Sequence, residues 1–191
     1  MKQFKPRRVL LAHGYNVSDG GKKTIDVLRP LLASKTVQVK DIDYGDFGLI
    51  DVFRHNNTVS RLIAGFVEEG DVGIGHSNGC AVLHKAACMG APFSRLIYIN
   101  PALKSDIVLP DHIKSVDVFF TEHDVATKYA RLLRKVRFFD KDFIWGEMGC
   151  TGYTGSDLRF NNNDMSAYAK GHSAVFLPEN IGKILPIIRE K

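Results

Sequence analysis

Cysteine and long apolar runs are both scarce in this sequence. The 191 residues include three cysteines, none with metal-ligand spacing, and this odd, low number favours a reducing compartment. No apolar segment approaches the length needed to cross a membrane, and the run at residues 9–12 is too short for a signal peptide. We therefore expect a soluble, cytoplasmic protein with no membrane span.

Dense blocks of charge are also missing. The formal net charge is +5, and the basic residues come closest to a cluster at residues 128–137. They fit a solvated helix face, because no recognition motif or interleaved aromatic residues accompany them. Paired metal-ligand spacing is absent, and the nearest match to a dinucleotide fingerprint has Asn78 where the third glycine belongs. We expect no nucleic-acid partner, no metal and no cofactor.

Short apolar segments alternate with amphipathic ones along the chain. Strands are predicted at residues 9–12, 37–42, 71–75, 96–99 and 116–121, the second of them near a sheet edge. Helices are predicted at residues 22–33, 59–69, 78–89 and 126–133 and from residue 178 onward. Residues 45–57 and 146–171 are predicted as loops and 138–145 as strand-like. This alternation predicts one α/β domain over residues 1–191, a three-layer sandwich with a mainly parallel central sheet.

Two glycines bracket a serine at residues 75–79, which read Gly-His-Ser-Asn-Gly between a predicted strand and a predicted helix. Such a sharp turn forces the serine backbone into a sparsely populated conformation, and the glycines leave room for it. The turn would lift the Ser77 hydroxyl clear of the sheet, next to the N–H groups of a helix N-terminus. Ser77 is therefore the candidate nucleophile, and the alternative is a plain tight turn.

A nucleophilic serine requires a base, and the base requires an acid that orients it. His172 lies just before the last predicted helix, and Asp124 follows the predicted strand at residues 116–121. The alternatives are an idle turn residue for His172 and a helix N-cap for Asp124, with Glu122 as a rival acid. Since parallel strands end at one edge of their sheet, we expect Ser77, Asp124 and His172 to meet there.

The chain order serine, acid, histidine resembles that of the α/β-hydrolase superfamily, in a small form without a cap domain. The matching segments are residues 10–14, 75–79, 120–124 and 171–173. The resemblance implies the α/β-hydrolase fold, and an oxyanion hole formed by the backbone N–H groups of Tyr15 and Asn78. We expect the Asn78 side chain to matter far less than that of Ser77.

The resemblance also implies a serine hydrolase that cleaves a small-molecule carboxylic ester through an acyl-enzyme intermediate. A thioester or an amide could be the substrate bond instead. A catalytically inactive α/β-hydrolase-fold protein that binds a ligand or partner is the alternative from another class, and the oligomeric state stays open. His13 and His76 are expected to pack and to orient loops beside Ser77. Six residues are expected either to line an acyl pocket or to cover the core: Phe47, Leu49, Phe53, Trp145, Met148 and Tyr153.

Overall fold

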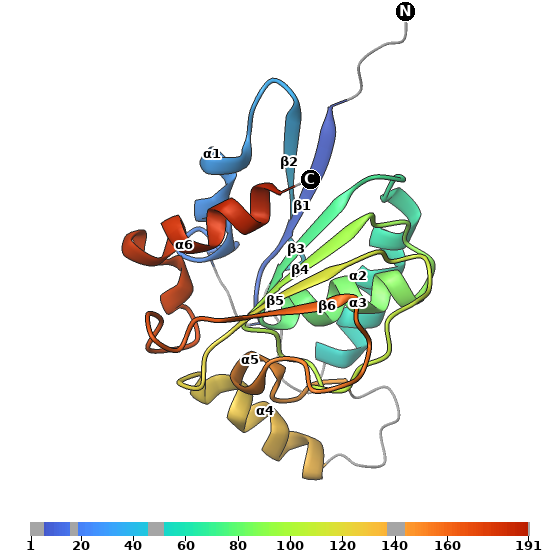
Figure 1. The fold of residues 1–191 in the computed structure, drawn as a ribbon. Helices are drawn as coiled ribbons and strands as arrows, with labels where there is room; N and C mark the ends of the chain where they lie inside the picture. The colour runs from blue at the N-terminus through green and yellow to red at the C-terminus, as the bar shows by residue number, and fades with distance from the viewer. Residues whose placement is uncertain (1–5, 16–18, 46–51, 137–143, 191) are drawn as a thin grey trace, which may run out of the picture.

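Six strands form one sheet in which every neighbouring pair is parallel (Figure 1). In spatial order they are β2 (Val37–Ile42), β1 (Arg7–Ala12), β3 (Val72–His76), β4 (Arg95–Ile99), β5 (Val116–Phe120) and β6 (Phe160–Asp164). The structure is a computed structural model, and it describes residues 6–15, 19–45, 52–136 and 144–190, apart from the side chains of residues 53 and 131–136. The predicted mainly parallel sheet is confirmed.

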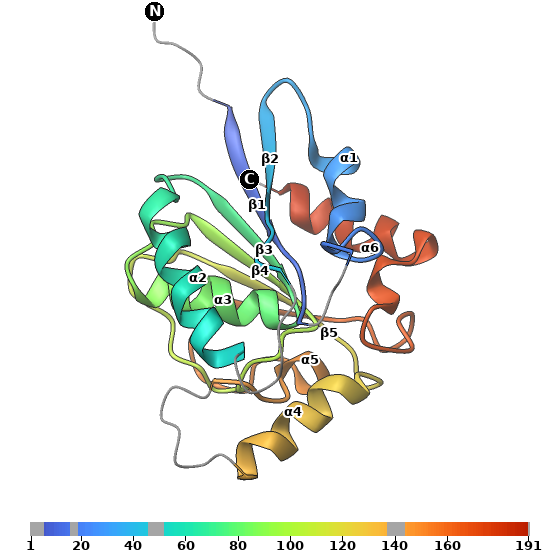
Figure 2. The same cartoon turned by 180° about the vertical axis from the view of Figure 1, so that it is seen from behind.

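Helices cover both faces of the sheet (Figures 1 and 2). One face carries α2 (Val52–Phe66) and α3 (Asn78–Cys88), and the other carries η1 (Ile25–Leu28), α1 (Arg29–Leu32) and α6 (Pro178–Arg189), which follows η2 (Ala174–Phe176). At the carboxyl end of the sheet lie α4 (Val125–Val136) and α5 (Met148–Thr151). Of the helices described, none combines the length and the apolar character needed to cross a bilayer.

In the central strands, side chains alternate between two buried clusters. In β1, Leu10 packs in the cluster with α2 and α3, whereas Leu11 packs in the cluster with α1 and α6. In β4, Tyr98 and Ile99 divide in the same way. Because both faces are covered, these strands are apolar throughout, which is why the sequence predicts buried strands at these positions.

The first predicted helix is shorter than expected. Residues 22–33 form the turns of η1 and α1 instead of one continuous helix. Pro30 lies at the start of α1, where its missing N–H costs nothing but where a preceding helical turn would clash with its ring. Further along, α2 begins at Val52, so the predicted loop at residues 45–57 is wrong from residue 52 onward.

The long loop predicted at residues 146–171 contains regular structure. It includes α5 and the edge strand β6, which pairs with β5 from Phe160 to Asp164. The sequence does not predict β6, because its three consecutive asparagines break the apolar pattern of a strand. An edge strand can form without that pattern, since it pairs through its backbone on one side only and buries few apolar side chains. Of the strand-like segment predicted at 138–145, residues 138–143 lie outside the described residues, and Ile144 and Trp145 are not in a strand.

The direction of sheet growth reverses at β1. β2 pairs with one edge of β1 and β3 pairs with the other, with Ala12 opposite Gly75. In open parallel sheets, ligands bind in the crevice at the carboxyl ends of the strands where this reversal occurs. The segment after β1 and the segment after β3 therefore meet where chemistry is expected.

Candidate active site

Ser77 lies in the sharp turn between β3 and α3, as the sequence predicts. Its backbone has φ 54° and ψ −118°, and a positive φ is uncommon for a residue with a side chain. The Ser77 N–H donates to the carbonyl of Ile99 at 3.0 Å, and the Ser77 carbonyl accepts from the N–H of Ala102 at 3.1 Å. These bonds to β4 and the segment after it hold the serine in a conformation that the chain would otherwise avoid.

Both glycines of the turn are required by close approaches. A Cβ atom on Gly75 would lie 2.7 Å from the backbone nitrogen of Cys80, and one on Gly79 would lie 2.1 Å from the carbonyl oxygen of Ala12. The first glycine therefore lets α3 fold back against β3. The second lets α3 begin directly against the end of β1.

The structure brings the predicted acid and base together. Asp124 is fully buried, and its Oδ2 atom lies 2.8 Å from Nδ1 of His172. Burial alone would raise the pKa of Asp124, but the hydrogen bond and charge of His172, with donors from Thr127 and Asn100, hold it below its ordinary value. The ionised carboxylate accepts a hydrogen bond from Nδ1–H of His172. The proton therefore stays on Nδ1, and the lone pair of Nε2 is available. The rival acid, Glu122, has an exposed side chain and no bond to His172.

The Ser77 hydroxyl is not hydrogen-bonded to His172 in this structure. No hydrogen bond between described residues joins the Ser77 hydroxyl to the His172 ring. His76 nevertheless holds the His172 loop beside the serine, because its Nε2–H donates to the His172 carbonyl at 3.2 Å and the two ring centroids are 4.8 Å apart. Burial, with the neighbouring His172, lowers the pKa of His76 to about 3, so His76 stays neutral. This is the orienting role expected for His76.

Two residues that support the acid have no obvious signal in the sequence. Asn100 is fully buried at φ 45°, and its amide donates to Oδ2 of Asp124 at 3.1 Å. A Cβ atom on Gly149 would lie 2.7 Å from the same oxygen, so only glycine fits there. An asparagine directly after a buried strand is the single hint, because asparagine tolerates positive φ.

The predicted oxyanion segments lie side by side after β1 and β3. The Asn78 N–H is the first of α3 and so has no partner within the helix. In the other segment, Nδ1–H of His13 donates to the Gly14 carbonyl at 2.8 Å. That carbonyl belongs to the same planar trans peptide as the Tyr15 N–H, which must point the opposite way. His13 thus orients the loop, as expected for it.

Three of the six residues suggested for an acyl pocket pack in or against the core. Trp145 and Met148 are buried in the core beside α3, and Tyr153 stacks on Phe160 with ring centroids 3.7 Å apart. Phe47, Leu49 and the Phe53 side chain lie outside the described part of the protein. Within that part, no three histidine, cysteine or acidic side chains gather to hold a metal ion.

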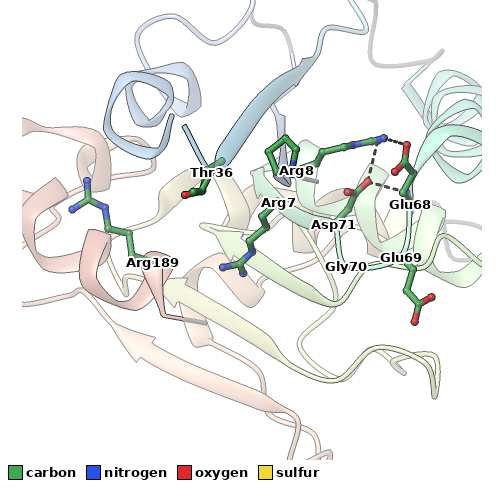
Figure 3. Close-up of a pocket in the computed structure, with 10 residues that line it drawn as sticks. Arg7, Arg8, Thr36, Glu68, Glu69, Gly70, Asp71 and Arg189 are labelled. Atoms are coloured by element: carbon green, nitrogen blue, oxygen red, sulfur yellow. Dashed lines mark hydrogen bonds and ion pairs between the residues drawn. The ribbon is translucent and has the colours of Figure 1, made fainter. Parts of the chain in front are cut away.

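A cavity of about 660 Å³ lies at the amino ends of β1 and β2 (Figure 3). Ser77 lies at the other end of the sheet, after the carboxyl end of β3. Arg7 and Arg189 border it, and Arg8 pairs with both Glu68 and Asp71 at its rim. No serine or histidine is among the described residues that line this cavity. The cavity is therefore separate from the candidate active site.

Comparisons with known proteins find the fold but no relative by sequence. No family model and no curated protein matches the chain. Among solved structures, the esterase domain of a Rhodothermus marinus protein matches with TM-score 0.57 and 12% identity, over 98% of this chain and 87% of that one. Est1E from Butyrivibrio proteoclasticus matches with TM-score 0.55 and 15% identity, over 98% and 88% of the two chains. An extracellular α/β-hydrolase from a Paenibacillus species matches with TM-score 0.54 and 12% identity, over 97% and 100%.

These matches span nearly the whole chain, and the structures named as hydrolases and esterases share its sheet and helices. The protein therefore has the α/β-hydrolase fold, which the resemblance in the sequence implied.

Proposed function

We propose that the protein is a serine hydrolase that cleaves a carboxylic ester. One observation carries this proposal: the buried Asp124 carboxylate holds His172 by Nδ1 at 2.8 Å, at the same sheet edge where Ser77 sits at a positive φ. Acid, base and strained serine together are what acyl transfer requires. The esterase names among the structural matches agree with this reaction class.

In the proposed reaction, the Ser77 hydroxyl oxygen attacks the carbonyl carbon of the ester while Nε2 of His172 takes its proton. Asp124 stabilises the imidazolium through Nδ1–H. The N–H groups of Asn78 and Tyr15 donate to the oxyanion. Collapse of this intermediate breaks the bond to the leaving oxygen, which takes the proton from His172 and departs as the alcohol. Water, deprotonated by His172, then attacks the acyl carbonyl carbon. Collapse of this second intermediate breaks the bond to the Ser77 oxygen, which takes the proton back from His172, and the acid is released.

The missing bond between Ser77 and His172 is compatible with this reaction. Catalytic hydrogen bonds are often long or poorly aligned in the absence of substrate and tighten in the reacting complex. A rotation of the Ser77 side chain changes the hydroxyl position without moving the backbone, which is held by Ile99 and Ala102.

A fluorophosphonate probe tests the proposal, because it forms a covalent bond only with an activated serine. We expect the native protein to be labelled at Ser77, as located by peptide mass spectrometry, and Ser77→Ala to be unlabelled. An unlabelled native protein would favour the inactive, ligand-binding alternative. Matched 4-nitrophenyl ester, thioester and anilide substrates then identify the preferred bond. We expect the ester to be cleaved fastest.

A further inference from the structure

We propose that a buried hydrogen-bond network centred on the Asn78 side chain positions the two donors of the oxyanion hole. The inference rests on the proposed function, since it names residues that position the same site. Four polar side chains form the network: Asn78, Asn56, Tyr44 and Trp145. They come from four separate segments and converge beneath the start of α3.

Every hydrogen-bonding position of the Asn78 amide is used. Asn56 donates to its Oδ1 atom at 2.7 Å and accepts from its Nδ2 atom at 3.0 Å, so the two amides form a closed pair between α2 and α3. The indole N–H of Trp145 also donates to Oδ1, at 2.9 Å. Asn78 is fully buried and Asn56 and Trp145 are nearly so, so losing one partner would leave polar atoms unsatisfied away from water.

Tyr44 connects this network to the other donor segment. Its hydroxyl accepts from Nδ2 of Asn78 at 3.4 Å and donates to the carbonyl of His13. Burial raises the pKa of Tyr44, so the hydroxyl stays protonated and remains a donor. The Tyr44 ring also stacks on His13, with centroids 4.2 Å apart, and His13 in turn fixes the Gly14 carbonyl. Asn78 is thereby tied to the peptide that carries the Tyr15 N–H.

Trp145 makes a second connection. Its indole N–H bonds to Asn78, and its ring contacts the Tyr15 ring edge-on, with centroids 5.8 Å apart. Both residues whose N–H groups are proposed to bind the oxyanion are thus held by one indole. Two independent connections between neighbouring loops fix their relative position better than either loop could alone, and displacements near 1 Å already cost about 100-fold in rate.

The network's role is to position groups, so its test uses a readout that general destabilisation leaves unchanged. An oxyanion hole fits a developing oxygen anion and fits the larger, weaker acceptor sulfur poorly. The ratio of kcat for 4-nitrophenyl acetate to kcat for its thionoester therefore reports on the hole itself. We expect Tyr44→Phe and Asn78→Ala to lower ester kcat by about 10- to 100-fold with KM little changed, and to reduce this ratio.

Ser60→Ala is the matched control. Ser60 is a fully buried residue of α2 whose hydroxyl donates to the Val82 carbonyl of α3 at 2.8 Å, outside the network. We expect this change to lower the melting temperature while leaving kcat and the ester-to-thionoester ratio as in the native protein. Tyr44→Phe removes a single oxygen atom. If Asn78→Ala does not fold, the kcat and the ester-to-thionoester ratio of Tyr44→Phe alone test the positioning role.

Different results would overturn the positioning role of the network and the proposed serine-hydrolase function. If the native protein turns over the ester through Ser77, but the folded Tyr44→Phe protein keeps its kcat and its ratio, the positioning role is overturned and the serine hydrolase remains. An equal loss of activity towards ester and thionoester would also overturn it. If the native protein neither hydrolyses the ester nor reacts with the fluorophosphonate, the proposed function fails and the positioning role falls with it.

Discussion

Among single residues, Asp124 is the one that, under the proposed mechanism, leaves Nε2 of His172 available to act as the base. Its Oδ2 atom accepts from Nδ1 of His172, while Oδ1 accepts from the N–H of Thr127 at 3.0 Å. Asp124→Asn keeps an oxygen for Thr127, but its amide NH2 group then faces the Asn100 donor and the His172 ring, where it favours the wrong imidazole tautomer. We expect kcat for 4-nitrophenyl acetate to fall about 1,000- to 10,000-fold, with the Ser77→Ala protein measured separately as the baseline without catalysis. Native kcat in Asp124→Asn would refute the role of the acid but leave the reaction class intact.

For whole elements, the close packing of α3 against β1 depends on Gly79. A Cβ atom there would overlap the Ala12 carbonyl, so we expect Gly79→Ala to lower the free energy of unfolding by about 3 kcal/mol or more. Gly182 in α6 is the matched control, because its added methyl group would meet nothing within 4 Å. Gly182→Ala should stabilise the protein by about 0.5–1 kcal/mol. Urea unfolding of both variants checks this, and a Gly79→Ala protein as stable as the native one would contradict it.

The strands, helices and turns also show how much of the structure could be predicted from the sequence. Buried strands and amphipathic helices were predictable because covered strands are apolar throughout, and so was the turn at Ser77, which depends on two local glycines. β6 was not, because its pairing with β5 is through the backbone and its asparagines carry no apolar pattern. The role of Asn100 was equally hidden, since its partner Asp124 lies in a different loop and only the folded sheet brings them together.

For the molecule as a whole, buried histidines should make stability fall in mild acid. Burial lowers the pKa of His84 to about 4, and burial with His172 nearby lowers that of His76 to about 3, from an ordinary value of 6.5. Both stay neutral in the fold, whereas the unfolded chain binds protons once the pH drops below about 6.5. Stability is therefore unaffected by these two histidines above that pH, and it falls progressively as the pH drops, down to about pH 4 for His84 and about pH 3 for His76.

Urea midpoints at pH 7 and pH 5 measure this loss. We expect a lower midpoint at pH 5 for the native protein and a smaller difference for His84→Gln. A His84→Gln protein with the full native difference would show that His84 does not carry this dependence.

The bonds that hold the Ser77 backbone have a consequence for how the protein is made. Their partners, Ile99 and Ala102, belong to the next strand and its exit, and so leave the ribosome well after the serine itself. Asp124 and His172 follow later still. Until Ile99 and Ala102 have emerged, the Ser77 backbone lacks both of the bonds that hold it at its positive φ. Under the proposed mechanism, an unfinished chain therefore lacks both the acid and the base that would activate its serine.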